Sequence, residues 1–255
     1  MKETIATIPL MNAFHADDEC PFCYLEREAE QHAISFILGS AYMEDDIRAE
    51  TDKAGFCREH YKKMFEYGNR LGCGLILTTH FKKKNEELKQ QIKMFSPAKA
   101  SMFSHFKKAQ STTDAPKTSI GVWAKAQQES CYICDYYKNT YSRYLDTFFE
   151  LYRKNPEFVE LFKKSKGFCL PHFADLVENA ETILSDKEKS DFYETLFPLM
   201  TENMQRVTDD LEWFCDKFDY KNKDADWKTS KDAIPRGMQK AAGSYPADPP
   251  YKSAL

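Results

Sequence analysis

The sequence contains one short pattern twice: residues 55–60 read GFCREH and residues 167–172 read GFCLPH. A Cys-x-x-Cys pair precedes each copy, CPFC at residues 20–23 and CYIC at residues 131–134. The two Cys-x-x-Cys pairs are offset by 111 positions and the two GFCxxH stretches by 112, so one inserted residue brings the copies into register. A period this long does not fit a solenoid and indicates a duplicated domain.

The residue types in this pattern are those of a zinc site. Three thiolates and one imidazole form a closed tetrahedral set typical of Zn2+. A helix start also favours the thiolate form of cysteine, because unpaired backbone N–H groups there stabilise negative charge. We predict two structural Cys3His sites with one zinc ion each, and we expect each repeat to close its own site. The eight predicted ligands are Cys20, Cys23, Cys57 and His60 in the first repeat, and Cys131, Cys134, Cys169 and His172 in the second.

The stretches between and after these motifs have the periodicity of helices. After CYIC, aromatic residues recur at three- and four-residue steps, which places them on one helical face. They are Tyr137, Tyr141, Tyr144, Phe148 and Tyr152. Strand signals are almost absent. We predict an all-α fold of two duplicated helical repeats of about four helices each, related by a pseudo-twofold and each clipped by a Cys3His site.

Helix boundaries are marked by capping residues. Asn155 is a predicted N-cap with Pro156 in the first turn, and Gly167 lies beyond the end of the same short helix. Ser185 and Glu188 predict a capping box at the start of a longer helix. Glycine before Phe-Cys suits a left-handed turn that brings the chain to the metal.

These signals divide the chain into four segments. Residues 1–96 form the first repeat and 119–220 the second, with a polar, proline-marked linker at 97–118. Residues 221–255 form a C-terminal short helix and an extended tail.

Composition excludes several classes of function. The net charge is -4, with 36 basic and 40 acidic residues, so nothing in the overall charge favours nucleic-acid binding. Without a run of about 18 apolar residues or a signal peptide, we expect a cytoplasmic protein that does not enter membranes. In that reducing compartment, eight cysteines indicate metal binding or catalysis before a disulfide framework.

Other interpretations of the cysteines explain the sequence pattern less well than zinc binding does. Cysteines kept for packing alone would not explain why His60 and His172 recur three residues after a cysteine. CPFC looks like a glutaredoxin motif, but no βαβ pattern surrounds it. A zinc-thiolate redox switch stays open. Cys73 and Cys215, outside the motifs, are expected to serve packing.

In its two CxxC…GFCxxH units, the chain resembles an uncharacterised family of bacterial proteins. This family is common among Firmicutes and is classed as a domain of unknown function. The resemblance covers nearly the whole chain, including the stretch WKTSKDAIPRGMQKAAG that begins at Trp227. It supports the architecture and implies no activity.

Three hypotheses for function follow. The first is a zinc-binding helical scaffold or interaction protein, for which a partner would be another protein. The second is a metal- or redox-responsive regulator that uses the same thiolates. The third is an enzyme with its active site in the cleft between the repeats. Four protein ligands leave zinc no open position, which argues against catalysis at the metal.

Overall fold

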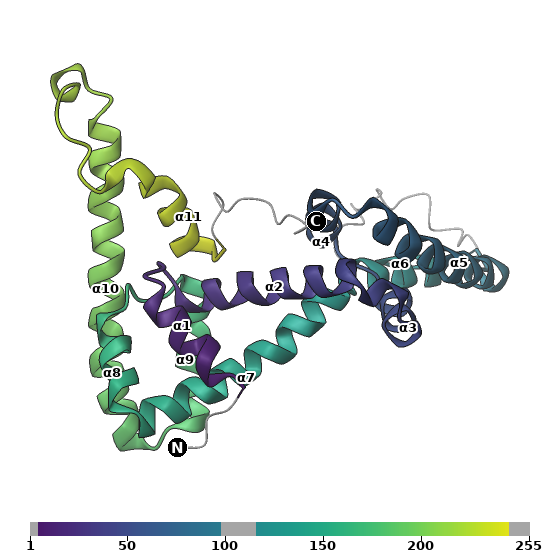
Figure 1. Cartoon of the computed structure of the whole chain (residues 1–255), viewed down its shortest axis with the longest axis horizontal. Coiled ribbons are helices and arrows are strands. Elements are labelled where there is room, and N and C mark those ends of the chain that lie inside the picture. The colour runs from purple at the N-terminus through teal and green to yellow at the C-terminus, as the bar shows by residue number, and fades with distance from the viewer. Residues whose placement is uncertain (1–4, 98–115, 245–255) are drawn as a thin grey trace, which may run out of the picture. The chain divides into compact units, whose positions relative to one another are not determined.

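A computed structural model describes residues 5–97 and 116–244, and within these ranges every regular element is a helix (Figure 1). The helices before the gap are α1 Thr7–His15, α2 Pro21–Gly39, η1 Ala41–Met43, α3 Asp45–Ala54, α4 Arg58–Tyr67 and α5 Arg70–Met94. Those after it are α6 Ser119–Glu129, α7 Tyr132–Lys154, α8 Pro156–Lys164, α9 Leu170–Ile183, α10 Asp186–Asp216, η3 Tyr220–Asn222, η4 Ser230–Asp232 and α11 Ala233–Ala242. The all-α prediction is confirmed. No helix of the described part has the length and apolar character needed to cross a membrane.

The described residues fall into two compact units. Unit 1 contains residues 5–30 and 137–244, and unit 2 contains residues 31–97 and 116–136. Helices α2 and α7 each begin in one unit and end in the other. Each unit therefore contains parts of both sequence repeats. The pseudo-twofold relation between the repeats and their boundaries stay predictions.

Unit 1 is built around a cluster of phenylalanines. Phe22 of α2, Phe148 of α7, Phe162 of α8 and Phe192 of α10 are all fully buried, together with Phe168 from the second GFC turn. Their rings meet mostly edge-to-face or tilted, for example Phe148 against Phe162 at 5.6 Å between centroids. Aromatic packing of this kind adds about 0.5–1.5 kcal/mol per pair beyond the burial of area. The ring before Cys169 is thus part of the core, which fixes where that cysteine emerges.

Unit 2 has a smaller, mostly aliphatic core. Ile34 and Ile37 from the end of α2, Ile76 from α5 and Ile133 from α7 are buried there. Phe56 of the first GFC turn packs with them and is 6% exposed. The shared Gly-Phe of the two motifs has the same structural reason in both units: Phe anchors the turn in the core next to the cysteine.

The predicted helix boundaries are largely confirmed. The Asn155 side chain accepts from the Phe158 backbone N–H at 3.2 Å, and Ser185 with Glu188 forms the capping box. Gly55 and Gly167 have φ of +64° and +73°. Pro198 lies inside α10, and the helix continues across it. The linker 97–118 lies mostly outside the described residues, as does the end of the tail.

Candidate metal centres

The eight predicted ligands gather into two groups of four in the structure. The first group, in unit 1, contains Cys20, Cys23, Cys169 and His172; the second, in unit 2, contains Cys57, His60, Cys131 and Cys134. Each group thus takes its Cys-x-x-Cys from one sequence repeat and its Cys-x-x-His from the other. The prediction that each repeat closes its own site is wrong, although the eight residues and the Cys3His composition are as expected.

The length of the helices explains this crossed pairing. Helix α2 begins at Pro21, directly after Cys20, and runs for 19 residues, which is about 28 Å at 1.5 Å per residue. The segments that follow it, η1 and α3, pack on one another and on α5 in unit 2. The first GFCxxH stretch, residues 55–60, therefore lies in unit 2, whereas Cys20 and Cys23 at the start of α2 lie in unit 1. Helix α7, with 23 residues, carries the chain in the same way from unit 2 into unit 1.

In both groups the ligands come from the first turns of two helices. Cys169 is the N-cap of α9 and Cys57 the N-cap of α4, and their carbonyl oxygens accept the first helical hydrogen bonds. Cys20 and Cys131 have the same place at the starts of α2 and α7. No side chain caps α4 or α9. Backbone N–H groups at a helix start favour the thiolate form of a nearby cysteine, and each group of sulfurs lies at two such helix starts.

The first group has the dimensions of a single tetrahedral ion site. The Sγ of Cys169 lies 3.8 Å from that of Cys20 and 3.6 Å from that of Cys23. Nδ1 of His172 lies 3.4, 3.6 and 3.1 Å from the sulfurs of Cys20, Cys23 and Cys169. A zinc ion with Zn–S of about 2.3 Å and Zn–N of about 2.0 Å requires edges of about 3.8 Å between sulfurs and about 3.5 Å between sulfur and nitrogen.

The second group has nearly the same dimensions. Nδ1 of His60 lies 3.1 Å from Cys57 Sγ, 3.2 Å from Cys131 Sγ and 3.5 Å from Cys134 Sγ. The sulfurs of Cys57 and Cys134 are 3.9 Å apart. Both groups therefore fit one zinc-sized ion, and both histidines offer Nδ1. Ligands of a multi-iron cluster bind different iron atoms and would lie farther apart.

The electrostatics of the groups also favours a bound cation. In the first group, burial works to lower the pKa of His172, but contacts with the three cysteine sulfurs outweigh it and raise this pKa well above its usual range. In the second, burial and the neighbouring charge of Cys131 raise the pKa of Cys134. A divalent ion bound among the three clustered sulfurs would supply the positive charge that these shifts favour.

The two groups differ in their access to solvent. All four residues of the first are buried, with Cys20 and Cys169 fully so. In the second group His60 and Cys131 are buried but Cys57 and Cys134 are only partly so. The two groups are alike in chemistry and unlike in exposure.

Helix α11 covers the first group. A Cβ atom added to Gly243, just beyond α11, would lie 3.6 Å from Cys169 Sγ and 3.9 Å from Cys23 Sγ. Gly243 has φ +78° and ψ 173°, a backbone conformation open almost only to glycine. A side chain at position 243 would therefore touch the sulfurs, so the chain passes close to them just after α11.

A buried polar network holds α11 in this position. Lys240 of α11 is 1% exposed, and its Nζ donates to the carbonyl oxygen of Glu19 at 2.7 Å and to that of Lys166. Glu19 directly precedes Cys20, and Lys166 directly precedes the second GFC turn. The Lys240 ammonium therefore links the two chain segments that carry the cysteines and the histidine of this group. Gln239 donates to Asp18 Oδ1 at 2.7 Å, and the same oxygen accepts from the Cys20 backbone N–H.

This role of α11 was not predicted from the sequence. The sequence predicts a short helix within residues 221–255, but a lysine between glutamine and alanine gives no sign that it will be buried. Of the two cysteines expected in packing, Cys73 is partly buried and its Sγ lies 3.6 Å from the Met64 carbonyl oxygen. Cys215 is exposed, so packing does not account for it.

Comparisons with known proteins bear on the whole chain. No curated protein and no solved structure matched it. A family model described as "Family of unknown function (DUF6062)" matches residues 1–248. The chain therefore belongs to this uncharacterised family, DUF6062.

Proposed function

We propose that the chain is a zinc-binding helical protein in which two structural Cys3His zinc ions hold the two units in shape, and that it acts through its surface as a scaffold or interaction protein. The observation that carries the proposal is the approach of eight ligand atoms in two compact sets of four. Four protein ligands fill a tetrahedral shell, which is the arrangement of structural zinc.

The crossed pairing gives each ion a large effect on folding. Cys23 and Cys169 are 146 residues apart, and His60 and Cys131 are 71 apart. Closing loops of this length by covalent or metal links removes much conformational freedom from the unfolded chain. Binding of structural zinc provides about 10–16 kcal/mol in small domains, and here that free energy would be coupled to folding.

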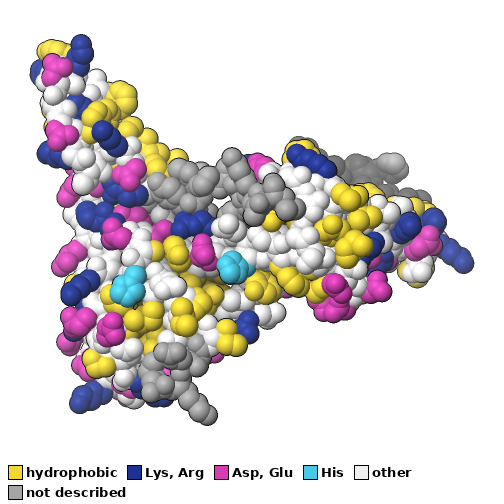
Figure 2. All heavy atoms as spheres, viewed as in Figure 1, with side chains coloured by type: hydrophobic (Ala, Val, Ile, Leu, Met, Phe, Trp, Pro, Cys, Tyr) yellow, Lys and Arg dark blue, Asp and Glu magenta, His cyan; other side chains and the backbone are white. Residues whose placement is uncertain are grey.

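A role exerted through the surface is supported by exposed aromatic side chains. Phe218 and Tyr220, beyond the end of α10, are 75% and 82% exposed. Phe218 packs with Phe214 and Trp227, and a contiguous group of partly exposed aromatic side chains is typical of an interaction surface. Acidic and basic side chains are interspersed over the part of the surface that α10 forms, on the left of Figure 2. A protein partner with both apolar and polar contacts fits this surface better than a polyanion does.

Zinc content and its effect on folding test the proposal. Protein purified without added metal is expected to contain about two zinc ions per chain by elemental analysis. Removal of zinc with a strong chelator should abolish cooperative thermal unfolding, measured by circular dichroism, and zinc should restore it. A chain free of zinc whose melting is unchanged by the chelator would contradict the proposal.

A second candidate, a redox-responsive regulator, is favoured by the partial exposure of Cys57 and Cys134. Their sulfurs are 3.9 Å apart. Oxidation by hydrogen peroxide would join them: the two thiolates lose two electrons, the O–O bond breaks, two protons are taken up, two waters form and the zinc ion leaves. The buried first group would react more slowly.

The order of zinc release tests this second candidate. Mild peroxide should release about one zinc ion per chain first and produce a Cys57–Cys134 disulfide, identified by mass spectrometry and reversed by dithiothreitol. A disulfide between Cys169 and Cys20 or Cys23 should appear only later. Simultaneous loss of both ions, or resistance of both, would contradict it. The third hypothesis, an enzyme with its active site in the cleft between the repeats, stays a prediction.

A further inference from the structure

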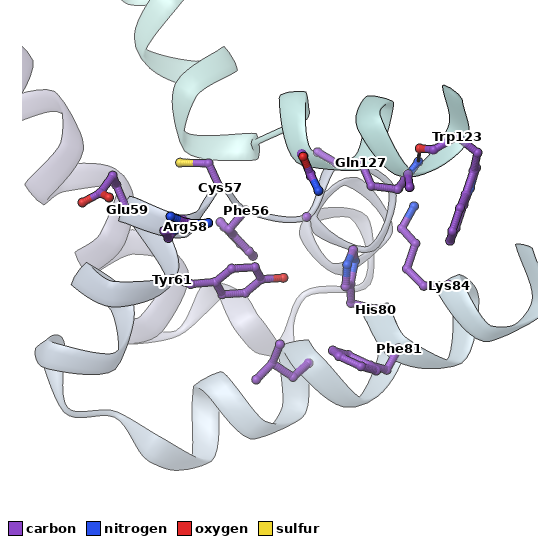
Figure 3. Close-up of a pocket in the computed structure, with 15 residues that line it drawn as sticks. Phe56, Cys57, Arg58, Glu59, Tyr61, His80, Phe81, Lys84, Trp123 and Gln127 are labelled. Atoms are coloured by element: carbon purple, nitrogen blue, oxygen red, sulfur yellow. Dashed lines mark hydrogen bonds between the residues drawn. The ribbon is translucent and has the colours of Figure 1, made fainter. Parts of the chain in front are cut away.

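Unit 2 contains a cavity of about 990 Å3 beside the second metal group. Its walls are the turn from α3 to α4, one side of α5 and one side of α6 (Figure 3). Its lining includes His80, Phe81 and Lys84 from α5 and Trp123 from α6. This volume is at the upper end of the range for small-molecule sites, which is about 300–1,000 Å3.

Aromatic side chains form much of the wall. Phe81 is 60% exposed although it lies in the middle of α5, and Trp123 faces the same space from α6 (Figure 3). The indole Nε1 of Trp123 lies 3.4 Å from Glu87 Oε2, which fixes the ring. Apolar area left open and held in place is suited to stacking against a planar molecule.

His80 provides a hydrogen-bond acceptor. Its Nδ1 lies 3.0 Å from the Asp52 carbonyl oxygen, and because a carbonyl only accepts, Nδ1 carries the proton. Nε2 of the neutral ring is then an acceptor. Burial lowers the pKa of His80 more than the Asp52 carbonyl raises it, so the neutral ring prevails near pH 7. Close packing against Gly55, where an added Cβ would lie 2.8 Å from Cε1, fixes the ring's position.

Lys84 provides a positive charge one helical turn further along α5. Its Nζ donates to Glu87 at 2.9 Å and to the Lys53 carbonyl oxygen at 3.4 Å. An ammonium has three donors, so one is available for a ligand beside these two contacts. Residues four apart on a helix are neighbours, so His80 and the Lys84 ammonium, which is paired with Glu87, share one face of α5.

The corresponding place in unit 1 is closed. A Cβ on Gly167 would meet Met200 Sδ at 3.1 Å, and Met200 is 4% exposed within the phenylalanine core. The GFC turn of unit 1 thus packs on a core methionine, whereas that of unit 2 packs on a histidine that lines an open cavity. The same local motif has a sealed environment in one unit and a polar, accessible one in the other.

We propose that this cavity is a binding site for a planar aromatic carboxylate that also carries a ring N–H or hydroxyl donor. The ring stacks against Phe81 and Trp123, the donor binds Nε2 of His80, and the carboxylate binds Lys84. Cys57 lies at the edge of the same cavity, so the ligand would lie beside the second metal group. The site does not require the metal to take part in binding.

The test uses indole-2-carboxylate, whose N–H and carboxylate are adjacent on one edge of a planar ring. Binding is measured by calorimetry and by the indole N–H signals of the zinc-loaded full chain, which has three tryptophans. The Trp123 signal should shift, while those of Trp213 and Trp227, both in unit 1, should not. Loss of the carboxylate in indole-2-carboxamide, or of the donor in 1-methylindole-2-carboxylate, should each weaken binding about tenfold, as expected for one hydrogen bond to a charged or buried group.

Variants locate the site on α5. Lys84→Met and His80→Phe should each weaken binding about tenfold, whereas Lys82→Met, an exposed neighbour on the same helix, should not. Zinc content is measured for every variant, which separates loss of this site from loss of the metal groups. The proposal would be overturned if indole-2-carboxylate did not bind at millimolar concentration, or if Lys84→Met and His80→Phe both left its affinity unchanged. Equal shifts of all three tryptophan signals would also overturn it.

Discussion

Gly55 has φ +64° and ψ −158°, and a Cβ at this position would lie 2.8 Å from Cε1 of His80. The glycine was expected from the sequence to make a turn with positive φ, and it does. A second reason for glycine at this position is the His80 imidazole, which leaves no room for a Cβ. This contact joins residues 25 positions apart and could not be predicted from the motif. The two causes can be separated by mutation.

We expect Gly55→Ala to lower the free energy of unfolding by at least about 1–3 kcal/mol, the cost of an L-residue in this backbone conformation. The collision with His80 adds to this. Gly74→Ala is the matched control, because Gly74 lies within α5 with nothing within 4 Å of an added Cβ. It should stabilise by about 1 kcal/mol. Denaturant unfolding at fixed free zinc measures both.

The double variant Gly55→Ala/His80→Ala isolates the collision. It should recover the part of the lost unfolding free energy that comes from the collision with the imidazole. The part that comes from the positive φ should remain lost. Equal stabilities of the Gly55→Ala and Gly74→Ala proteins would contradict this account of the turn.

At the scale of elements, helix boundaries were predictable wherever a local signal was present. The Asn155 cap and the capping box of Ser185 with Glu188 each act within three residues, so spacing alone identified them. Helices α1 and α6 were not foreseen. Helix α6 has no fully buried residue, so no strong apolar stripe marks it in the sequence. The position of α11 over the first metal group depends on contacts between segments up to 221 residues apart.

Helix α11 should control how fast the first group loses its ion. Lys240→Met leaves the Glu19 and Lys166 carbonyl oxygens and the Glu19 carboxylate without their ammonium, a loss of about 1–3 kcal/mol. The open form would become roughly ten- to a hundredfold more populated. One of the two zinc ions should therefore transfer to a coloured chelator at least about tenfold faster.

Lys231→Met is the matched control, since Lys231 is exposed and lies in η4, two residues before α11. Its zinc transfer should match that of the unmodified chain. Identical transfer rates in Lys240→Met and Lys231→Met would show that α11 does not protect the site.

At the scale of the whole molecule, the eight residues that gather into two Cys3His groups were predictable from the sequence, but their pairing was not. All eight residues of the two groups belong to two repeated motifs, Cys-x-x-Cys and Cys-x-x-His. The spacing within each motif is the same whichever Cys-x-x-Cys pairs with whichever Cys-x-x-His. The choice of partner is set by how far α2 and α7 extend before the chain turns, and both pairings satisfy the same sequence pattern. Local spacing therefore predicted two Cys3His sets but not which halves would meet.

Zinc content of two double variants tests the crossed pairing most directly. In Cys20→Ser/Cys169→Ser both changes fall in the first group, so the second group should retain about one zinc ion per chain under mild chelation. In Cys20→Ser/Cys57→Ser each group loses one thiolate, and zinc content should fall close to zero. One retained zinc ion in the second variant and none in the first would contradict the crossed pairing and support sites closed within each repeat.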